Sequence, residues 1–130
     1  MILVDTHVVI WLALEPDRIS KKARAVIEEA RRVAQGLAIS DITLLEIAAI
    51  ERKQRIQLNS SLETFLSEVE SRFAVLPMNG RICVRAVTLP AGYPKDPADR
   101  IIGATAMVEG IPLVTADHDI RRSKALGTIW

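Results

Sequence analysis

In the stretch MILVDTH, residues 1–7, an apolar run ends abruptly on a carboxylate, Asp5. The stretch PLVTADHD, residues 112–119, repeats this construction and leads to Asp117. Short, uniformly apolar runs are typical of strands that are buried on both faces of a sheet. We therefore predict that both runs are strands of one sheet and that each delivers an acid to a strand end.

The rest of the chain predicts helices alternating with further short strands. Helices are expected over about residues 6–14, 20–36, 42–53, 62–69, 80–89 and 96–110, and strands at LAIS, FAVLP and GTIW. Gly36 is expected to end the second helix. This alternation indicates an α/β fold with a parallel sheet covered on both faces. We predict one domain over residues 1–130.

The composition is that of an ordinary globular protein, with 49% hydrophobic and 25% charged residues. The 17 basic and 16 acidic residues leave a net charge of +1, so bulk charge does not favour a nucleic-acid partner. The single cysteine, Cys83, cannot form an internal disulfide and is expected to fill the core. No apolar run suffices for a membrane span, and the start of the chain does not resemble a secretory signal. We expect a cytoplasmic protein.

Four acids on separate segments are predicted to meet at one edge of the sheet. Ligands of open parallel sheets bind beyond the carboxyl ends of the strands. Asp5 and Asp117 follow strands, and Glu46 and Asp99 lie on helices that begin near that edge. Each acid also has an ordinary explanation. Asp5 and Asp117 suit helix caps, Glu46 suits a capping box with Thr43, and Asp99 suits the helix dipole.

Gathered carboxylates repel one another. Protonation could relieve the repulsion, but a divalent cation does so more directly. Two of them ~4 Å apart repel by about 4 kcal/mol at an effective dielectric near 20. Several such pairs would consume much of a net stability of roughly 5–15 kcal/mol. Oxygen ligands without a cysteine or histidine set favour Mg²⁺ or Mn²⁺ over zinc, and His7 and His118 are too isolated to form such a set. Such an ion can activate water and neutralise charge on a phosphodiester.

Other polar residues near these acids have simpler expected roles. Asp96, directly before a proline, is predicted to be the N-cap of the last long helix. Thr6 and Thr115 are expected to make hydrogen bonds at strand ends. Arg100 is expected to form a salt bridge with the neighbouring Asp99.

Four stretches together resemble the motifs of PIN domains, specifically the VapC toxins of bacterial and archaeal toxin–antitoxin pairs. They are ILVDTH, ISDITLLEIA, DPADRIIGATA and PLVTADHDI, in this order over essentially the whole chain. The resemblance implies an α/β/α sandwich and a Mg²⁺- or Mn²⁺-dependent endoribonuclease. It carries Asp5, Glu46, Asp99 and Asp117 over as the catalytic, metal-binding acids. It also implies a homodimer and a cognate VapB antitoxin that lies over the active-site groove.

Two other α/β classes fit the sequence less well. A phosphoacceptor receiver domain needs adjacent acids after its first strand, where Thr6 follows Asp5. A haloacid-dehalogenase-like phosphatase needs a second Asp where this chain has His7. A more serious alternative is a PIN-like module that binds RNA or protein without cutting, and the complete acid set argues against it. The nuclease hypothesis requires that the four carboxyl groups face a common cleft.

Overall fold

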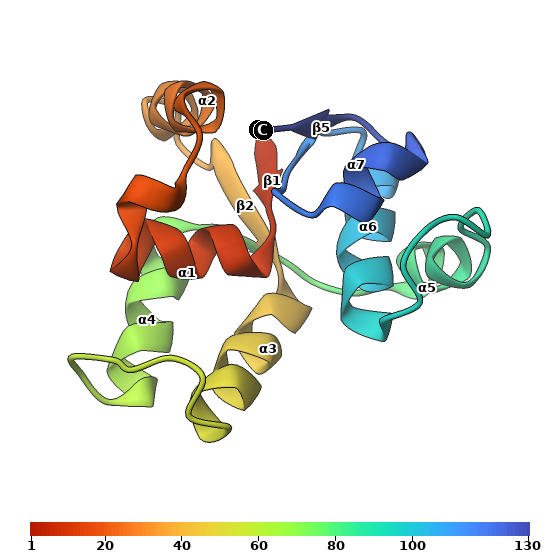
Figure 1. The fold of residues 1–130 in the computed structure, drawn as a ribbon. Coiled ribbons are helices and arrows are strands. Elements are labelled where there is room, and N and C mark those ends of the chain that lie inside the picture. The colour runs from red at the N-terminus through yellow and green to blue at the C-terminus, as the bar shows by residue number, and fades with distance from the viewer.

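Five parallel strands form one sheet in the order β3-β2-β1-β4-β5 (Figure 1). The computed structural model describes residues 1–130. The strands are β1 (Ile2–Val4), β2 (Leu37–Ser40), β3 (Ala74–Leu76), β4 (Leu113–Val114) and β5 (Thr128–Ile129). The predicted edge strand at GTIW is therefore β5. Because all strands run in the same direction, their carboxyl ends lie at one edge of the sheet.

Helices connect the strands and cover both faces of the sheet. They are α1 (Thr6–Leu14), the 3-10 helix η1 (Pro16–Arg18), α2 (Lys21–Arg31), α3 (Asp41–Arg52), α4 (Leu62–Arg72), α5 (Gly80–Val87), α6 (Pro97–Glu109) and α7 (His118–Ser123). Figure 1 shows α1, α2 and α4 on one side of the strands and α5 to α7 on the other, with α3 beyond the end of β2. None of these helices combines the length and the apolarity needed to cross a membrane.

Alternate residues of each central strand point into two separate cores. In β1, Ile2 and Val4 pack with residues of α1 to α4, whereas Leu3 packs with residues of α6 and α7. In β2, Ala38 likewise packs on the α6 side. This alternation follows from the two-residue period of a strand. It confirms the predicted three-layer α/β/α sandwich with a central parallel sheet.

The chain changes direction across the sheet at β1. From β1 it proceeds through β2 to β3, and it then returns to place β4 and β5 on the other side of β1. The connections that leave β1 and β4 therefore diverge, and such a switch point opens a crevice at the carboxyl ends of the strands. Asp5 directly follows β1, and Thr115 to Asp117 follow β4.

The prediction that Gly36 ends the second helix is wrong. Helix α2 ends at Arg31, and the residue with a positive φ is Gln35, at 59°. A Cβ atom on Gly36 would overlap the carbonyl group of Ala30. Glycine is needed here because the chain passes close to the end of α2 on its way into β2.

The expectation that Cys83 fills the core is also wrong, because its side chain is exposed. Helix α5 buries only Ile82 and Ala86, which pack with Ala104 of α6. These two residues are four apart and lie on one face of the helix. Cys83 lies outside that face.

Tyr93, in the loop before α6, fills a slot that a glycine leaves open. Its side chain is 1% exposed, and its hydroxyl donates a hydrogen bond of 3.1 Å to the carbonyl oxygen of Asp99. A Cβ atom on Gly103 would overlap the phenol ring and hydroxyl of Tyr93. The ring is thus held against the first turns of α6, which carry Asp99.

We predict that Gly103→Ala lowers the free energy of unfolding by about 1–3 kcal/mol, the usual cost of overpacking a core. The Tyr93 phenol has to move to admit the methyl group. Gly80→Ala is the control, because no atom lies within 4 Å of the added Cβ there. Urea unfolding of both variants tests this, and equal midpoints would show that the slot is not tight.

Candidate active site

Asp5 is buried at the carboxyl end of β1, with both carboxylate oxygens hydrogen-bonded. Its side chain caps α1 as Oδ1 accepts from the Thr6 amide at 2.8 Å. Oδ2 accepts from the Thr115 hydroxyl at 2.7 Å. The residue is 3% exposed. A buried carboxylate needs such donors to offset the loss of water, so its position and orientation are tightly defined.

Thr115 connects Asp5 to Asp117. Its hydroxyl donates to Asp5 and accepts from the Asp117 amide at 3.0 Å, which confirms the expected strand-end role of this threonine. Asp117 is the N-cap of α7, where its Oδ1 accepts from the Ile120 amide at 3.0 Å. Its Oδ2 makes no hydrogen bond within the chain and stays available.

Glu46 belongs to this site and not to a capping box. The N-cap of α3 is Ser40, so Glu46 lies in the second turn and has no cap partner in Thr43. Its Oε1 instead accepts from the Thr6 hydroxyl at 2.5 Å. Burial raises the pKa of Glu46, the hydrogen bond from Thr6 opposes that rise, and the charges of Asp5 and Asp96 add to it. Helix α3 thus directs a partly desolvated carboxyl group toward the first turn of α1.

Asp99 lies in the first turn of α6 and carries the largest carboxyl pKa shift of the site. Asp96 caps this helix as predicted, because its Oδ2 accepts from the Asp99 amide at 3.1 Å. Burial raises the pKa of Asp99 to about 7, and the negative charges of Asp5, Asp96, Glu46 and Asp117 add to the rise. Asp96, expected only to cap, is therefore a fifth contributor to the negative potential.

The expected salt bridge between Arg100 and Asp99 is absent. Arg100 Nη1 donates instead to the carbonyl oxygen of Ala86 at 3.1 Å, and so links α6 to α5. Successive residues of a helix point in directions about 100° apart, so the guanidinium is directed away from its neighbour's carboxyl group. The Asp99 carboxyl group consequently has no basic partner.

Two further residues were not identified from the sequence as part of the site. His7 Nε2 accepts from the Ala116 amide at 3.1 Å, and its Nδ1 lies 3.6 Å from Asp5 Oδ2. Tyr93 holds the Asp99 carbonyl, and burial raises the pKa of its phenol. The only feature of the sequence that could have pointed to Tyr93 is that this single tyrosine closely precedes Asp96.

The four predicted acids lie close enough together for their charges to interact. The charges of Asp5, Glu46 and Asp117 all act on Asp99. As the side chains lie, no three Asp, Glu, His or Cys residues are spaced to hold an ion together. A divalent ion would therefore have to draw the carboxylates closer by side-chain rotation. The donor set fits such an ion, because it consists of carboxylate oxygens that form no ion pair with a lysine or arginine. Their role as ligands stays a prediction.

The proton on Asp99 makes stability depend on pH. Its pKa rises from 3.8 to about 7 on folding, so between these values the folded state retains a proton that the unfolded state has lost. The free energy of unfolding of the metal-free protein therefore falls as pH rises through this interval. Asp99→Asn removes the ionisable group. We predict that it raises the melting temperature above about pH 7, in chelator, and has little effect below about pH 4.

Asp119→Asn is the control for this experiment, because the Asp119 side chain is 63% exposed and pairs with Arg122 at the surface. Thermal unfolding across the pH range compares each variant with the wild type. A stabilisation by Asp99→Asn that does not vary with pH would contradict the shifted pKa.

Comparison with known proteins agrees with this geometry. The PIN domain family matches residues 2–126. Ribonuclease VapC22 from Mycobacterium tuberculosis (strain ATCC 25618 / H37Rv) is 35% identical over 131 residues, which cover 99% of this chain and 98% of that protein.

Solved structures share the same fold. The chain superposes on the toxin-antitoxin complex from Klebsiella pneumoniae with a TM-score of 0.67 at 25% identity, covering 96% of this chain and 94% of that one. For VapBC2 from Rickettsia felis bound to a promoter DNA fragment, the TM-score is 0.72 at 19% identity, with 98% and 97% covered. The chain therefore belongs to the PIN-domain family and, within it, to the VapC proteins.

Proposed function

We propose that this protein is a metal-dependent endoribonuclease, the toxin of a VapBC-type toxin–antitoxin pair. The observation that carries the proposal is that negative charges from Asp5, Glu46 and Asp117 all act on Asp99 at the switch point of a PIN fold. Membership of the VapC proteins supports the nuclease activity. We further propose that residues 1–130 act as one domain, in the cytoplasm and as a homodimer, as is typical of this family.

Asp5 and Asp99 would hold the principal Mg²⁺ or Mn²⁺, and Glu46 and Asp117 would complete the site directly or through water. A bound ion of this kind supplies an activated water and neutralises the charge of the phosphodiester. Asp99 favours this role, because its raised pKa reflects burial first and repulsion from neighbouring carboxylates second, and a cation would oppose both effects. The free Oδ2 of Asp117 is available for the same purpose.

The remaining residues of the site act on the positions of these acids. The Thr115 hydroxyl and Thr6 amide orient the Asp5 carboxylate, and the Thr6 hydroxyl holds Glu46. Tyr93 fixes the first turn of α6 and hence the backbone of Asp99. Preorganised positions matter because misplacement of reacting groups by about 1 Å can cost about 10²-fold in rate.

RNA cleavage by the purified protein tests the proposal. We expect cleavage of single-stranded RNA with Mg²⁺ or Mn²⁺, loss of cleavage in chelator, and a fall of at least about 10²-fold for Asp5→Asn, because electrostatic contributions at reacting centres have that size. Asp119→Asn, which changes an exposed carboxylate in the same way, is the control. Equal cleavage by wild type and Asp5→Asn would refute metal catalysis here, and RNA binding without any cleavage would favour the non-cutting module.

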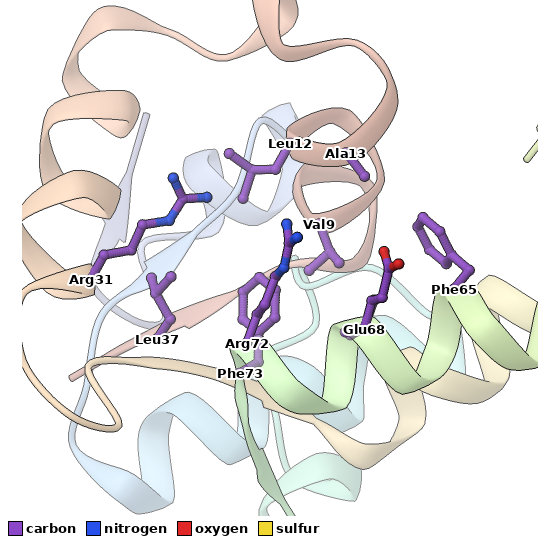
Figure 2. A pocket seen from close by; sticks show the side chains of 10 residues that line it. Val9, Leu12, Ala13, Arg31, Leu37, Phe65, Glu68, Arg72 and Phe73 are labelled. Atoms are coloured by element: carbon purple, nitrogen blue, oxygen red, sulfur yellow. The ribbon is translucent and has the colours of Figure 1, made fainter. Parts of the chain in front are cut away.

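A partly apolar groove supports the antitoxin as partner. A pocket of about 460 Å³ lies between α1, α2 and α4, lined by Val9, Leu12 and Phe65 among other apolar residues. Figure 2 shows the Arg31 and Arg72 side chains reaching into it. We propose that it receives an antitoxin segment with apolar side chains and a carboxylate. Such a segment complements the apolar lining and the two guanidinium groups, which outnumber the one carboxylate of the lining, Glu68. Structures of related fold include VapBC complexes.

Charge reversal in this groove tests the antitoxin proposal. Arg72→Glu is expected to raise the antitoxin concentration needed for half-inhibition about tenfold or more, since desolvated charge pairs at interfaces are worth several kcal/mol. Inhibition is measured relative to the uninhibited rate of each variant. Arg32→Glu is the control, because Arg32 is exposed on the same side of the sheet but does not line the pocket. Equal inhibition of the two variants would place the antitoxin elsewhere.

A further inference from the structure

Both tryptophans of the chain lie in one row of planar side chains that begins at the acidic site. The His7 and Trp11 rings meet edge to face with centroids 4.9 Å apart, and Trp11 lies 5.9 Å from Trp130. At the inner end, His7 Nδ1 is 3.6 Å from Asp5 Oδ2. At the outer end, the Arg18 guanidinium lies 4.0 Å above the Trp11 ring. The row therefore runs from the carboxylates toward solvent.

The fold brings these groups together from three segments. His7 and Trp11 are four residues apart on α1 and thus share one face of it. Trp130 directly follows β5, and the Thr115 amide donates to the Ile129 carbonyl oxygen beside it at 3.2 Å. Trp130 therefore lies at the same sheet edge as the acids. Arg18 ends the 3-10 helix that follows α1.

A pocket adjoins the outer end of this row. Its volume is about 430 Å³, and Trp11, Arg18, Arg55, Gln57 and Asn59 contribute to its lining. Glu15 also lines it and pairs with Arg18 at 3.0 Å. An aromatic face and a guanidinium plane stack on nucleobases, and side-chain amides can hydrogen-bond to the edges of bases.

We propose that this row and the adjoining pocket bind unpaired bases of single-stranded RNA next to the phosphodiester that is cleaved. The inference rests on the proposed nuclease function, which places the scissile phosphate at Asp5. The position of the row favours RNA over a peptide, because His7 lies 3.6 Å from Asp5 and a strand bound at the acids would have the row beside it. Stacking tolerates any base, so the site orients the strand without selecting a sequence.

Intrinsic fluorescence reports on this site directly, because the chain has no tryptophan outside the row. The wild-type protein is titrated in chelator with a short mixed-sequence single-stranded oligoribonucleotide. A second titration uses a chain of the same length and charge whose residues lack bases. We expect saturable quenching with the first and little with the second. Equal quenching by both, or none by either, would overturn the proposal.

Kinetics of two matched arginine variants give a second readout. Arg18→Ala is expected to raise KM for RNA about fivefold or more, with a smaller effect on kcat, because base stacking contributes about 1–3 kcal/mol per base. Arg32→Ala is the control, since Arg32 also forms an exposed i,i+3 ion pair, at 3.3 Å, but covers no ring. An unchanged KM for Arg18→Ala would overturn the proposal. It would also be overturned if the only effect of Arg18→Ala were weaker inhibition by the antitoxin.

The two hypotheses fail in different ways. If the wild type binds base-bearing RNA with quenching yet cleaves nothing with any divalent ion, the nuclease proposal fails and the base-binding site stands. If cleavage is normal while quenching and KM are insensitive to bases and to Arg18, the base-binding site fails alone.

Discussion

The burial of Asp5 between β1 and β4 is the constraint on which the rest of the site depends. Its two oxygens accept from the Thr6 amide and the Thr115 hydroxyl, so the carboxylate is buried without any Lys or Arg beside it. A lysine or arginine partner would neutralise this charge. Hydrogen-bond donors from the protein instead satisfy the oxygens while the negative charge remains. These donors belong to Thr6, which follows β1, and to Thr115, which follows β4. The segments after these two strands diverge at the switch point.

The same negative charge makes the neighbouring acids unstable as anions. Burial and the surrounding carboxylates raise the pKa of Asp99 to about 7, and Glu46 shifts in the same direction. The protein thereby stores an unfavourable interaction at one edge of its sheet. Under the proposed function, binding of a divalent cation would relieve this unfavourable interaction and convert it into affinity.

Sequence reasoning succeeded where the signal was local. The apolar runs, the caps at Asp96 and Asp117 and the alternation of helices with strands depend on neighbours within a few residues. Predictions from neighbouring residues were wrong where a side chain instead forms a hydrogen bond with a residue far away in the sequence. The spacing of Thr43 and Glu46 left a capping box open as an alternative to the site role of Glu46, whereas Glu46 accepts from Thr6, 40 residues away. Adjacency suggested a bridge from Arg100 to Asp99, but the guanidinium binds a carbonyl on α5.

Hydrophobic periodicity and residue chemistry are properties of short segments, so they predicted an α/β fold with a covered parallel sheet, strands that end in acids and four candidate carboxylates. The folded structure was needed to show which charges act on Asp99, which glycine admits Tyr93 and how the tryptophans align with His7. The physical reason is that these relations join segments far apart in the chain, as in the bond from Thr115 to Asp5 across 110 residues. No local propensity encodes such a contact, which exists only once both cores have packed.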